Sequence, residues 1–217
     1  MPKQTFFNLP DDKRENLINI AITEFAENDY QSASISRIVA EAGIAKGSFY
    51  QYFENKEDLY SYLLDLGAQQ KAKFLSSEPP DPEMDIFAYL RWLIQGGVRF
   101  EFSNHRLSQV GYRAVKSGSL PDAYLEQALA SANQFFTQLV AQGKTQGNID
   151  ENVDVEVAAF IFNTIFTELG TFMIDRLQMT GAFSQEDGRS AFDSPQAEAI
   201  FDQVLTILQF GMGVKEK

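Results

Sequence analysis

A short segment around residue 49 combines side chains that proteins use to contact nucleic acid. Phe49 and Phe53 are four residues apart, so on a helix both lie on one inner face. Lys46 is long enough to reach guanine O6 and N7 or a phosphate, and Ser48 and Gln51 can hydrogen-bond base edges or phosphates. Gly47 has no side chain and lets the backbone approach DNA. The outer face of this helix therefore predicts major-groove contacts, and it comprises Lys46, Gly47, Ser48, Tyr50, Gln51 and Tyr52.

A second set of polar residues suits phosphate oxygens. Ser34 and Ser36 lie at the start of the preceding helix, where hydroxyls and free backbone N–H groups favour an anion. Arg37 and Lys56 supply positive charge. Alternatives stay open for both: Arg37 can pair with Glu41 four residues later, and Lys56 can be a solvated charge near a helix start. Tyr50 can likewise pack beneath the turn instead of facing DNA.

These side chains need two short helices and a tight turn to hold them. Ser34 is a suitable N-cap, and the apolar positions that follow recur at helical spacing. Gly43 stands where a left-handed C′ residue closes the first helix. Upstream, the apolar stripe from residue 13 to residue 27 predicts a further helix, and residues 1–10 suggest a flexible arm. Together they predict a helix-turn-helix.

The run from Ala42 to Leu59, AGIAKGSFYQYFENKEDL, resembles the signature of TetR-family transcriptional regulators, as does the upstream run from Ile20 to Tyr30. The resemblance covers about the first 60 residues; Asn28 and Asp29 stand where members usually carry a glycine, which is a mild departure. It implies that Tyr50 and Tyr52 bind phosphates and pack against sugar or thymine methyl groups. It also implies an all-α fold, with an N-terminal three-helix DNA-binding domain at residues 1–56 and a helical effector-binding and dimerisation domain at residues 57–217.

The rest of the chain has helical patterns. Asn55 is a suitable cap for a helix that reaches residue 74, and further helices are expected near 82–102, 105–115 and 122–142, with a polar loop at 180–194. The last two helices are apolar on more than one side, so we expect them to pair across a two-fold axis as a four-helix bundle. The predicted interface residues are Ile161, Ile165, Phe172, Phe201, Leu205 and Leu208. Such a homodimer would place two recognition helices about 34 Å apart on a palindromic operator in double-stranded DNA.

An effector pocket is expected among the C-terminal helices if the resemblance extends that far. The candidate lining residues are aromatic, and together they favour a small apolar or aromatic effector. For any single one of them, a place in the core is the more common role. They are Tyr89, Trp92, Phe100, Tyr112, Phe135, Phe162 and Phe166.

Composition excludes several other functions. The 217 residues contain no cysteine and a single histidine, which argues against disulfides, cysteine metal sites and histidine-rich metal sites. No nucleophile elbow or phosphate-binding glycine signature is present, so we expect neither an enzyme nor a cofactor. The chain shows no signal-peptide pattern and no apolar run long enough to span a membrane, which predicts a soluble cytoplasmic protein.

The net charge of −12 conflicts with nucleic-acid binding. The first 56 residues hold six basic and eight acidic residues, so most of the excess acid lies further along the chain. Two hypotheses follow. One is a ligand-responsive DNA-binding regulator, expected to be a repressor. The other is a helical protein–protein adaptor that has lost DNA binding, but it gives no reason for Lys46, Ser48, Tyr50 and Lys56 to occur together.

Overall fold

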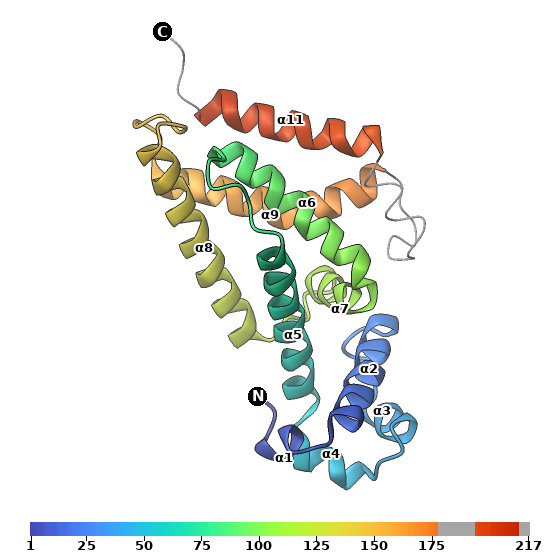
Figure 1. The fold of residues 1–217 in the computed structure, drawn as a ribbon. Helices are drawn as coiled ribbons and strands as arrows, with labels where there is room; N and C mark the ends of the chain where they lie inside the picture. The colour runs from blue at the N-terminus through green and yellow to red at the C-terminus, as the bar shows by residue number, and fades with distance from the viewer. Residues whose placement is uncertain (178–193, 213–217) are drawn as a thin grey trace. The chain divides into compact units, whose positions relative to one another are not determined.

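The computed structural model describes residues 1–177 and 194–212, and that part of the chain forms helices and no strand (Figure 1). The predicted all-α fold is therefore confirmed, while the loop predicted at 180–194 falls almost entirely outside the described residues. The helices are α1 (Gln4–Phe7), α2 (Asp11–Glu27), α3 (Ile35–Glu41), α4 (Lys46–Tyr52), α5 (Lys56–Ser77), α6 (Ile86–Ser103), α7 (His105–Lys116), α8 (Asp122–Thr145), α9 (Val155–Arg176) and α11 (Pro195–Met212).

The chain divides into two compact units. Unit 1 comprises Met1–Lys73 and Asn104–Leu125, and unit 2 comprises Phe74–Ser103 and Glu126–Lys217. Unit 1 contains the helix-turn-helix formed by α3 and α4, which the sequence predicts at these positions. The functional division at residue 56 stays a prediction, because the units are defined by packing and α7 joins the helix-turn-helix in unit 1.

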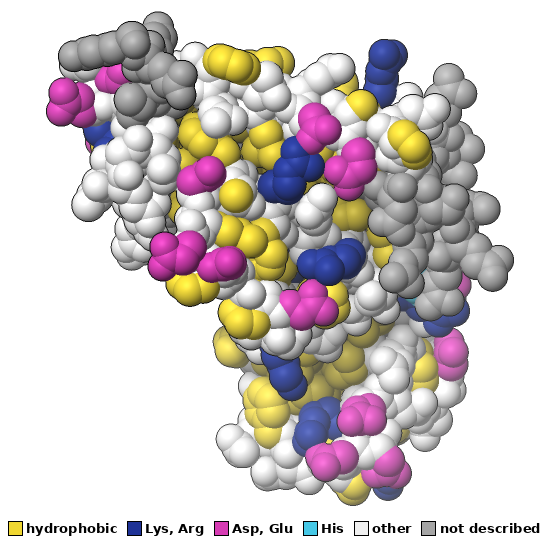
Figure 2. Space-filling model, turned by 45° about the horizontal axis from the view of Figure 1, so that its top comes forward, with side chains coloured by type: hydrophobic (Ala, Val, Ile, Leu, Met, Phe, Trp, Pro, Cys, Tyr) yellow, Lys and Arg dark blue, Asp and Glu magenta, His cyan; other side chains and the backbone are white. Residues whose placement is uncertain are grey.

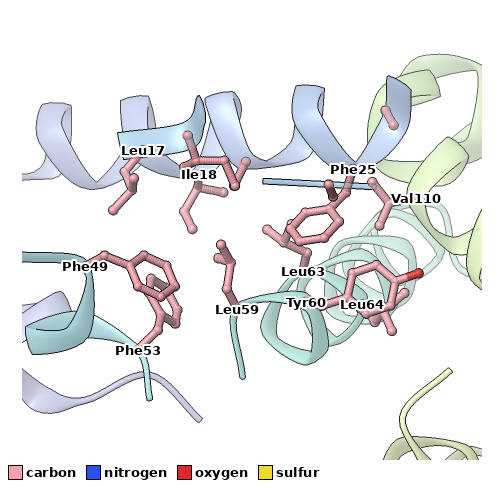
Figure 3. Packing of buried hydrophobic residues seen from close by; sticks show 14 of the residues in the cluster. Leu17, Ile18, Phe25, Phe49, Phe53, Leu59, Tyr60, Leu63, Leu64 and Val110 are labelled. Carbon is pink, nitrogen blue, oxygen red and sulfur yellow. The ribbon is translucent and has the colours of Figure 1, made fainter. Parts of the chain in front are cut away.

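An aromatic core holds unit 1 together. Figure 3 shows Leu17 and Ile18 of α2 pointing toward the Phe49–Phe53 pair and the start of α5. At the other end of α2, the ring of Phe25 lies beside that of Tyr60, with centroids 4.9 Å apart. Aromatic pairs of this kind add to the area that they bury, so α2 is fixed over both α4 and α5.

Helix α7 is an integral part of unit 1. Its Val110 and Ala114 are buried in the same core as Phe25. Two arginines of α7 reach residues on or just after α2: Arg106 Nη1 donates to Thr23 Oγ1 at 3.0 Å, and Arg113 Nη1 lies 2.8 Å from Asp29 Oδ1. The helix that follows α6 in the chain therefore packs with the helix-turn-helix.

The N-terminal segment is ordered, so the expectation of a flexible arm at residues 1–10 is wrong. Residues 4–7 form the short helix α1, and the side chain of Phe6 is fully buried. Its ring lies 5.0 Å from that of Phe53 and 5.4 Å from that of Tyr62. Phe6 packs into a site that forms only when α4 and α5 come together, so no local sequence pattern predicts its burial.

Unit 2 is built from α6, most of α8, α9 and α11. Phe87 and Leu90 of α6 pack with Phe136 and Val140 of α8 and with Phe162 of α9. Arg91 of α6 pairs with two carboxylates on α11, at 3.3 Å to Glu198 Oε2 and with a shorter contact to Asp202. Among the described residues, no helix is long and apolar enough to cross a membrane.

Candidate nucleic-acid interface and effector cavity

The first helix of the motif is capped as the sequence predicts. Ser34 is the N-cap of α3, and its hydroxyl accepts a hydrogen bond from the Arg37 N–H at 3.4 Å. After the helix, Gly43 has a φ of 66°, a left-handed conformation that a Cβ would strain. These two residues set the length of α3 and the sharpness of the turn, and thereby the direction in which α4 leaves it.

Helix α4 has the two faces predicted for it. Phe49 and Phe53 are fully buried and stacked, with ring centroids 5.5 Å apart. On the opposite side Lys46 and Gln51 are exposed, and Tyr50 exposes 48% of its surface even though it is an aromatic residue. Ser48 and Tyr52 are half-buried, and Ser36 in α3 is exposed.

Gly47 has no structural reason to be glycine within this chain. A Cβ built at this position would meet nothing within 4 Å, and its φ is not in the left-handed region. The fold therefore tolerates a side chain here, and a requirement for glycine must come from whatever approaches α4 from outside. A close approach by a nucleic-acid backbone or base is one such requirement.

Arg37 pairs with Glu24 of α2, and not with Glu41. Its Nε lies 3.0 and 3.1 Å from the two carboxylate oxygens, and its Nη2 also donates to the Ser32 carbonyl at 2.8 Å. Glu24 further accepts the Ser34 N–H at 2.8 Å. Burial opposes the charge of this carboxylate, but hydrogen bonds from Arg37 and Ser34 outweigh it and lower the pKa of Glu24. The phosphate contact predicted for Arg37 stays a prediction, because this arginine already ties α3 to α2.

Lys56 also has partners within its own unit. Its Nζ donates to the backbone carbonyls of Tyr30, Gln31 and Ala33 at 2.6, 3.3 and 3.2 Å, and lies 4.5 Å from the centroid of the Tyr30 ring. An ammonium group has three hydrogens to donate. A phosphate would therefore compete with these carbonyls, and the predicted phosphate role of Lys56 stays a prediction.

The turn between α2 and α3 gathers charged groups from several helices. Lys56 of α5 donates to backbone carbonyls of the turn, and Arg113 of α7 pairs with Asp29 in the turn. Where the turn meets α3, the Ser34 N–H donates to the carboxylate of Glu24 on α2. Each partner is at least ten residues from the group that it meets, so sequence spacing gave no signal for any of them. The turn positions α3, and thereby α4, through these long-range contacts.

The residues predicted to line an effector pocket do not form one site. Phe100 and Phe162 are buried in unit 2, where the ring of Phe136 lies 6.4 Å from that of Phe162 and 5.1 Å from that of Phe166. Tyr112 belongs to α7 in unit 1. Trp92 donates its Nε1–H to the Glu78 carbonyl at 3.2 Å.

A cavity of about 270 Å³ beside α8 in unit 2 includes two of the predicted residues. Tyr89 and Phe135 provide its aromatic surface, and burial raises the pKa of Tyr89. The sequence gave no signal for the polar side of this cavity, because three glutamines spaced four residues apart, two on α8 and one just after its end, resemble an ordinary solvated face. They are Gln138, Gln142 and Gln146.

The predicted dimer residues divide into two groups. Phe201, Leu205 and Leu208 are buried against their own chain, so their surface is already covered and does not support an interface. Ile161 and Ile165 are half-buried, and Phe172 is exposed. Besides Phe172, the exposed apolar side chains of α9 and α11 lie at positions that were not predicted, Val157, Phe160, Ile207 and Phe210. Figure 2 shows apolar side chains among charged ones on one face of the molecule.

Comparison with known proteins identifies the family. A model described as bacterial regulatory proteins, tetR family, matches residues 17–63, and one described as tetracyclin repressor-like, C-terminal domain, matches residues 84–213. The chain belongs to the TetR family. A crystal structure of a TetR family transcriptional regulator from Chloroflexus aurantiacus J-10-fl is 44% identical, with 99% of this chain and 100% of that chain covered and a TM-score of 0.79.

A further relative and a further structural neighbour are both from Bacillus subtilis. The fatty acid metabolism regulator protein of Bacillus subtilis (strain 168) is 26% identical over 167 residues, which are 75% of this chain and 84% of that protein. A structure of the regulator FadR from Bacillus subtilis in complex with stearoyl-CoA shares the fold, with 20% identity, coverage of 91% and 98%, and a TM-score of 0.66. The protein described here is thus a TetR-family transcriptional regulator with a DNA-binding helix-turn-helix, as the signature at residues 42–59 predicts.

Proposed function

We propose that this TetR-family regulator binds a palindromic operator as a homodimer, represses transcription in the cytoplasm and is released by a small apolar or aromatic effector. The observation that carries the proposal is the two-sided α4. Its inner face is fixed by buried Phe49 and Phe53, while Lys46, Tyr50 and Gln51 stand exposed on the other side. A helix held on one side and polar on the other is the form that enters a major groove.

Residue roles follow from position. Lys46, Ser48 and Gln51 are the proposed base-edge or phosphate contacts, and Gly47 leaves room for the DNA. Tyr50 and Tyr52 would contact phosphates, sugars or thymine methyl groups, with Ser34 and Ser36 at the start of α3 adding phosphate contacts. Arg37 and Lys56 would contribute mainly by holding α3 in place, given their partners inside unit 1. The functional division at residue 56 belongs to this proposal.

A second copy of the chain is the proposed partner of the apolar face of α9 and α11. Five large apolar side chains of these helices expose more than half of their surface: Val157, Phe160, Phe172, Ile207 and Phe210. Burying them against an identical face would produce the four-helix arrangement expected from the sequence, and the resulting dimer would carry two copies of α4.

The cavity beside α8 is the proposed effector site. Its aromatic residues suit an apolar or aromatic body, and its glutamine amides suit an uncharged polar group. Because one relative is a fatty acid metabolism regulator and one structural neighbour carries stearoyl-CoA, acyl-CoA thioesters belong in the first panel of effectors. A bound effector would favour a dimer conformation in which the long α5 holds the DNA-binding parts away from groove spacing.

Fluorescence anisotropy with the promoter fragment next to the protein's own gene tests DNA binding, at two salt concentrations and against random DNA. We expect tight, salt-sensitive binding that Tyr50→Ala reduces by about tenfold or more. Tyr50→Phe separates the hydroxyl from the ring, and Val115→Ala is the control, because Val115 is an exposed apolar residue on α7 in the same unit. Wild-type binding no better than to random DNA, with an intact dimer, would favour the adaptor hypothesis.

A further inference from the structure

The C-terminal end of α4 receives its hydrogen-bond donors from the first residues of the chain. The last carbonyls of a helix have no partner within it. Here the Lys3 ammonium donates to the Tyr50 carbonyl at 2.9 Å, the Lys3 backbone N–H donates to the Tyr52 carbonyl at 2.8 Å, and the Thr5 hydroxyl donates to the Gln51 carbonyl between them. Three consecutive carbonyls of a seven-residue helix are thus satisfied by residues 3 and 5.

These bonds are exposed to solvent, so they need an anchor to persist. Phe6 provides it. Its fully buried ring packs on Phe53, and Phe53 stacks on Phe49, the residue that fixes the inner face of α4. The segment is therefore attached twice, by its aromatic ring to the inner side of α4 and by polar groups to its end.

We propose that residues 3–6 form a clamp that fixes the C-terminal end of the recognition helix, with Lys3 and Phe6 as positioning residues for sequence-specific DNA binding. The clamp acts on the backbone of Tyr50 to Tyr52, whose side chains include proposed DNA contacts. The positive charge of Lys3 also suits the negative end of the helix dipole. The inference depends on the proposed use of α4 in DNA binding.

A positioning role and a phosphate contact by Lys3 predict different salt dependences. A lysine that contacts phosphate weakens binding to operator and to random DNA alike when it is removed, and it lowers the salt slope by about 1. A lysine that only positions α4 affects binding to the operator, because geometry matters there, and leaves random binding and the salt slope unchanged.

The test compares Lys3→Met and Phe6→Leu with wild type and with Lys13→Met, which removes the same charge from an exposed position on α2. We expect Lys3→Met to reduce operator affinity about fivefold with unchanged random binding and salt slope, and Phe6→Leu to reduce it about tenfold. Both should speed hydrogen exchange of the amides in residues 46–53, while Lys13→Met changes neither quantity. Lys3→Arg, which keeps the charge and the hydrogen-bond donors, should bind the operator as tightly as wild type.

Several outcomes would overturn the clamp. If Lys3→Met weakened both DNAs equally and lowered the salt slope, Lys3 would be a phosphate contact. If exchange in residues 46–53 and operator affinity stayed at wild-type values in both variants, residues 3–6 would not position α4. Failure of wild type to discriminate the operator from random DNA would instead refute the proposed function, which separates the two failures.

Discussion

The two units of this protein differ in how completely they cover their own apolar surface. In unit 1 the inner residues of every motif helix are buried, and charged side chains from α2, α3, α5 and α7 find partners around a single turn. In unit 2 the helices α9 and α11 bury one side and leave large apolar side chains exposed on another. The contacts that hold the motif helices of unit 1 are thus made within one chain, whereas the exposed apolar side chains of α9 and α11 in unit 2 are typical of a surface that binds a partner.

The difference matches the division of work that we propose. A DNA-reading helix must hold its geometry before it meets the operator, so its supports have to be internal. A dimerisation surface gains nothing from internal coverage, since its free energy comes from area that is buried only on association. Three experiments test this contrast, each with a matched residue in the other unit or on the same helix.

The largest effect should come from a charge placed on the exposed face of unit 2. Val157→Asp would bury an unpaired carboxylate on each side of the proposed two-fold interface, at a cost of about 3 kcal/mol or more, a loss of roughly a hundredfold in dimer affinity. Sedimentation velocity over a range of concentrations would measure the shift from dimer to monomer.

Val115 in unit 1 provides the control for this substitution. The two valines are exposed to nearly the same extent, 54% for Val115 and 56% for Val157. Val115→Asp should leave the dimer unchanged, because α7 already packs its inner face in unit 1. Equal effects of the two substitutions, or a Val157→Asp dimer as tight as wild type, would show that the second copy does not use this face.

A smaller effect should come from Glu24 in unit 1. Glu24→Gln leaves Arg37 without its carboxylate partner and should cost about 1–2 kcal/mol in the free energy of unfolding at pH 7, measured by urea denaturation. Because the folded state lowers the pKa of Glu24, its stabilisation is fully present above about pH 4.3, the unfolded value, and is lost as the pH falls through the lower folded pKa. The wild-type advantage should therefore shrink below that pH.

Glu27, three residues later and exposed on the same helix, is the control for Glu24. Glu27→Gln should change stability by less than about 0.5 kcal/mol at either pH. A Glu24→Gln variant as stable as wild type at pH 7, or a difference between them that grows on acidification, would show that the pair with Arg37 does not hold α3 to α2.

Local features of unit 1 could be predicted from the sequence, because each depends on residues a few positions apart. Ser34 caps α3, Gly43 has the left-handed conformation expected of it, and Asn55 Oδ1 accepts the Asp58 N–H at 2.9 Å. The burial of Phe49 and Phe53 followed from their spacing alone. Short-range chemistry of this kind is independent of the rest of the fold.

Contacts between distant residues were beyond prediction. The sequence offered Glu41 as a partner for Arg37, but folding brings the carboxylate of Glu24 to it from α2. The burial of Phe6 could not be predicted, because its site is formed by residues of α4 and α5 that are distant in the sequence. On α11 the failure had another cause: the helix is apolar on two sides, so its periodicity could not tell Leu205, which faces its own chain, from Ile207, which is exposed.

The smallest predicted effect uses one arginine from each unit. Arg113 pairs with Asp29 in the turn before α3, and Arg91 pairs with Glu198 and Asp202 across α6 and α11; their side chains are 32% and 34% exposed. Removing either guanidinium as Arg→Gln should cost only about 0.5–1 kcal/mol of stability, because these pairs are partly solvated. Only Arg113→Gln should also weaken operator binding, by about threefold, because its partner lies in the turn that positions α3 and α4. Equal losses of operator affinity in the two variants would mean that general stability, and not the position of this turn, sets the affinity for DNA.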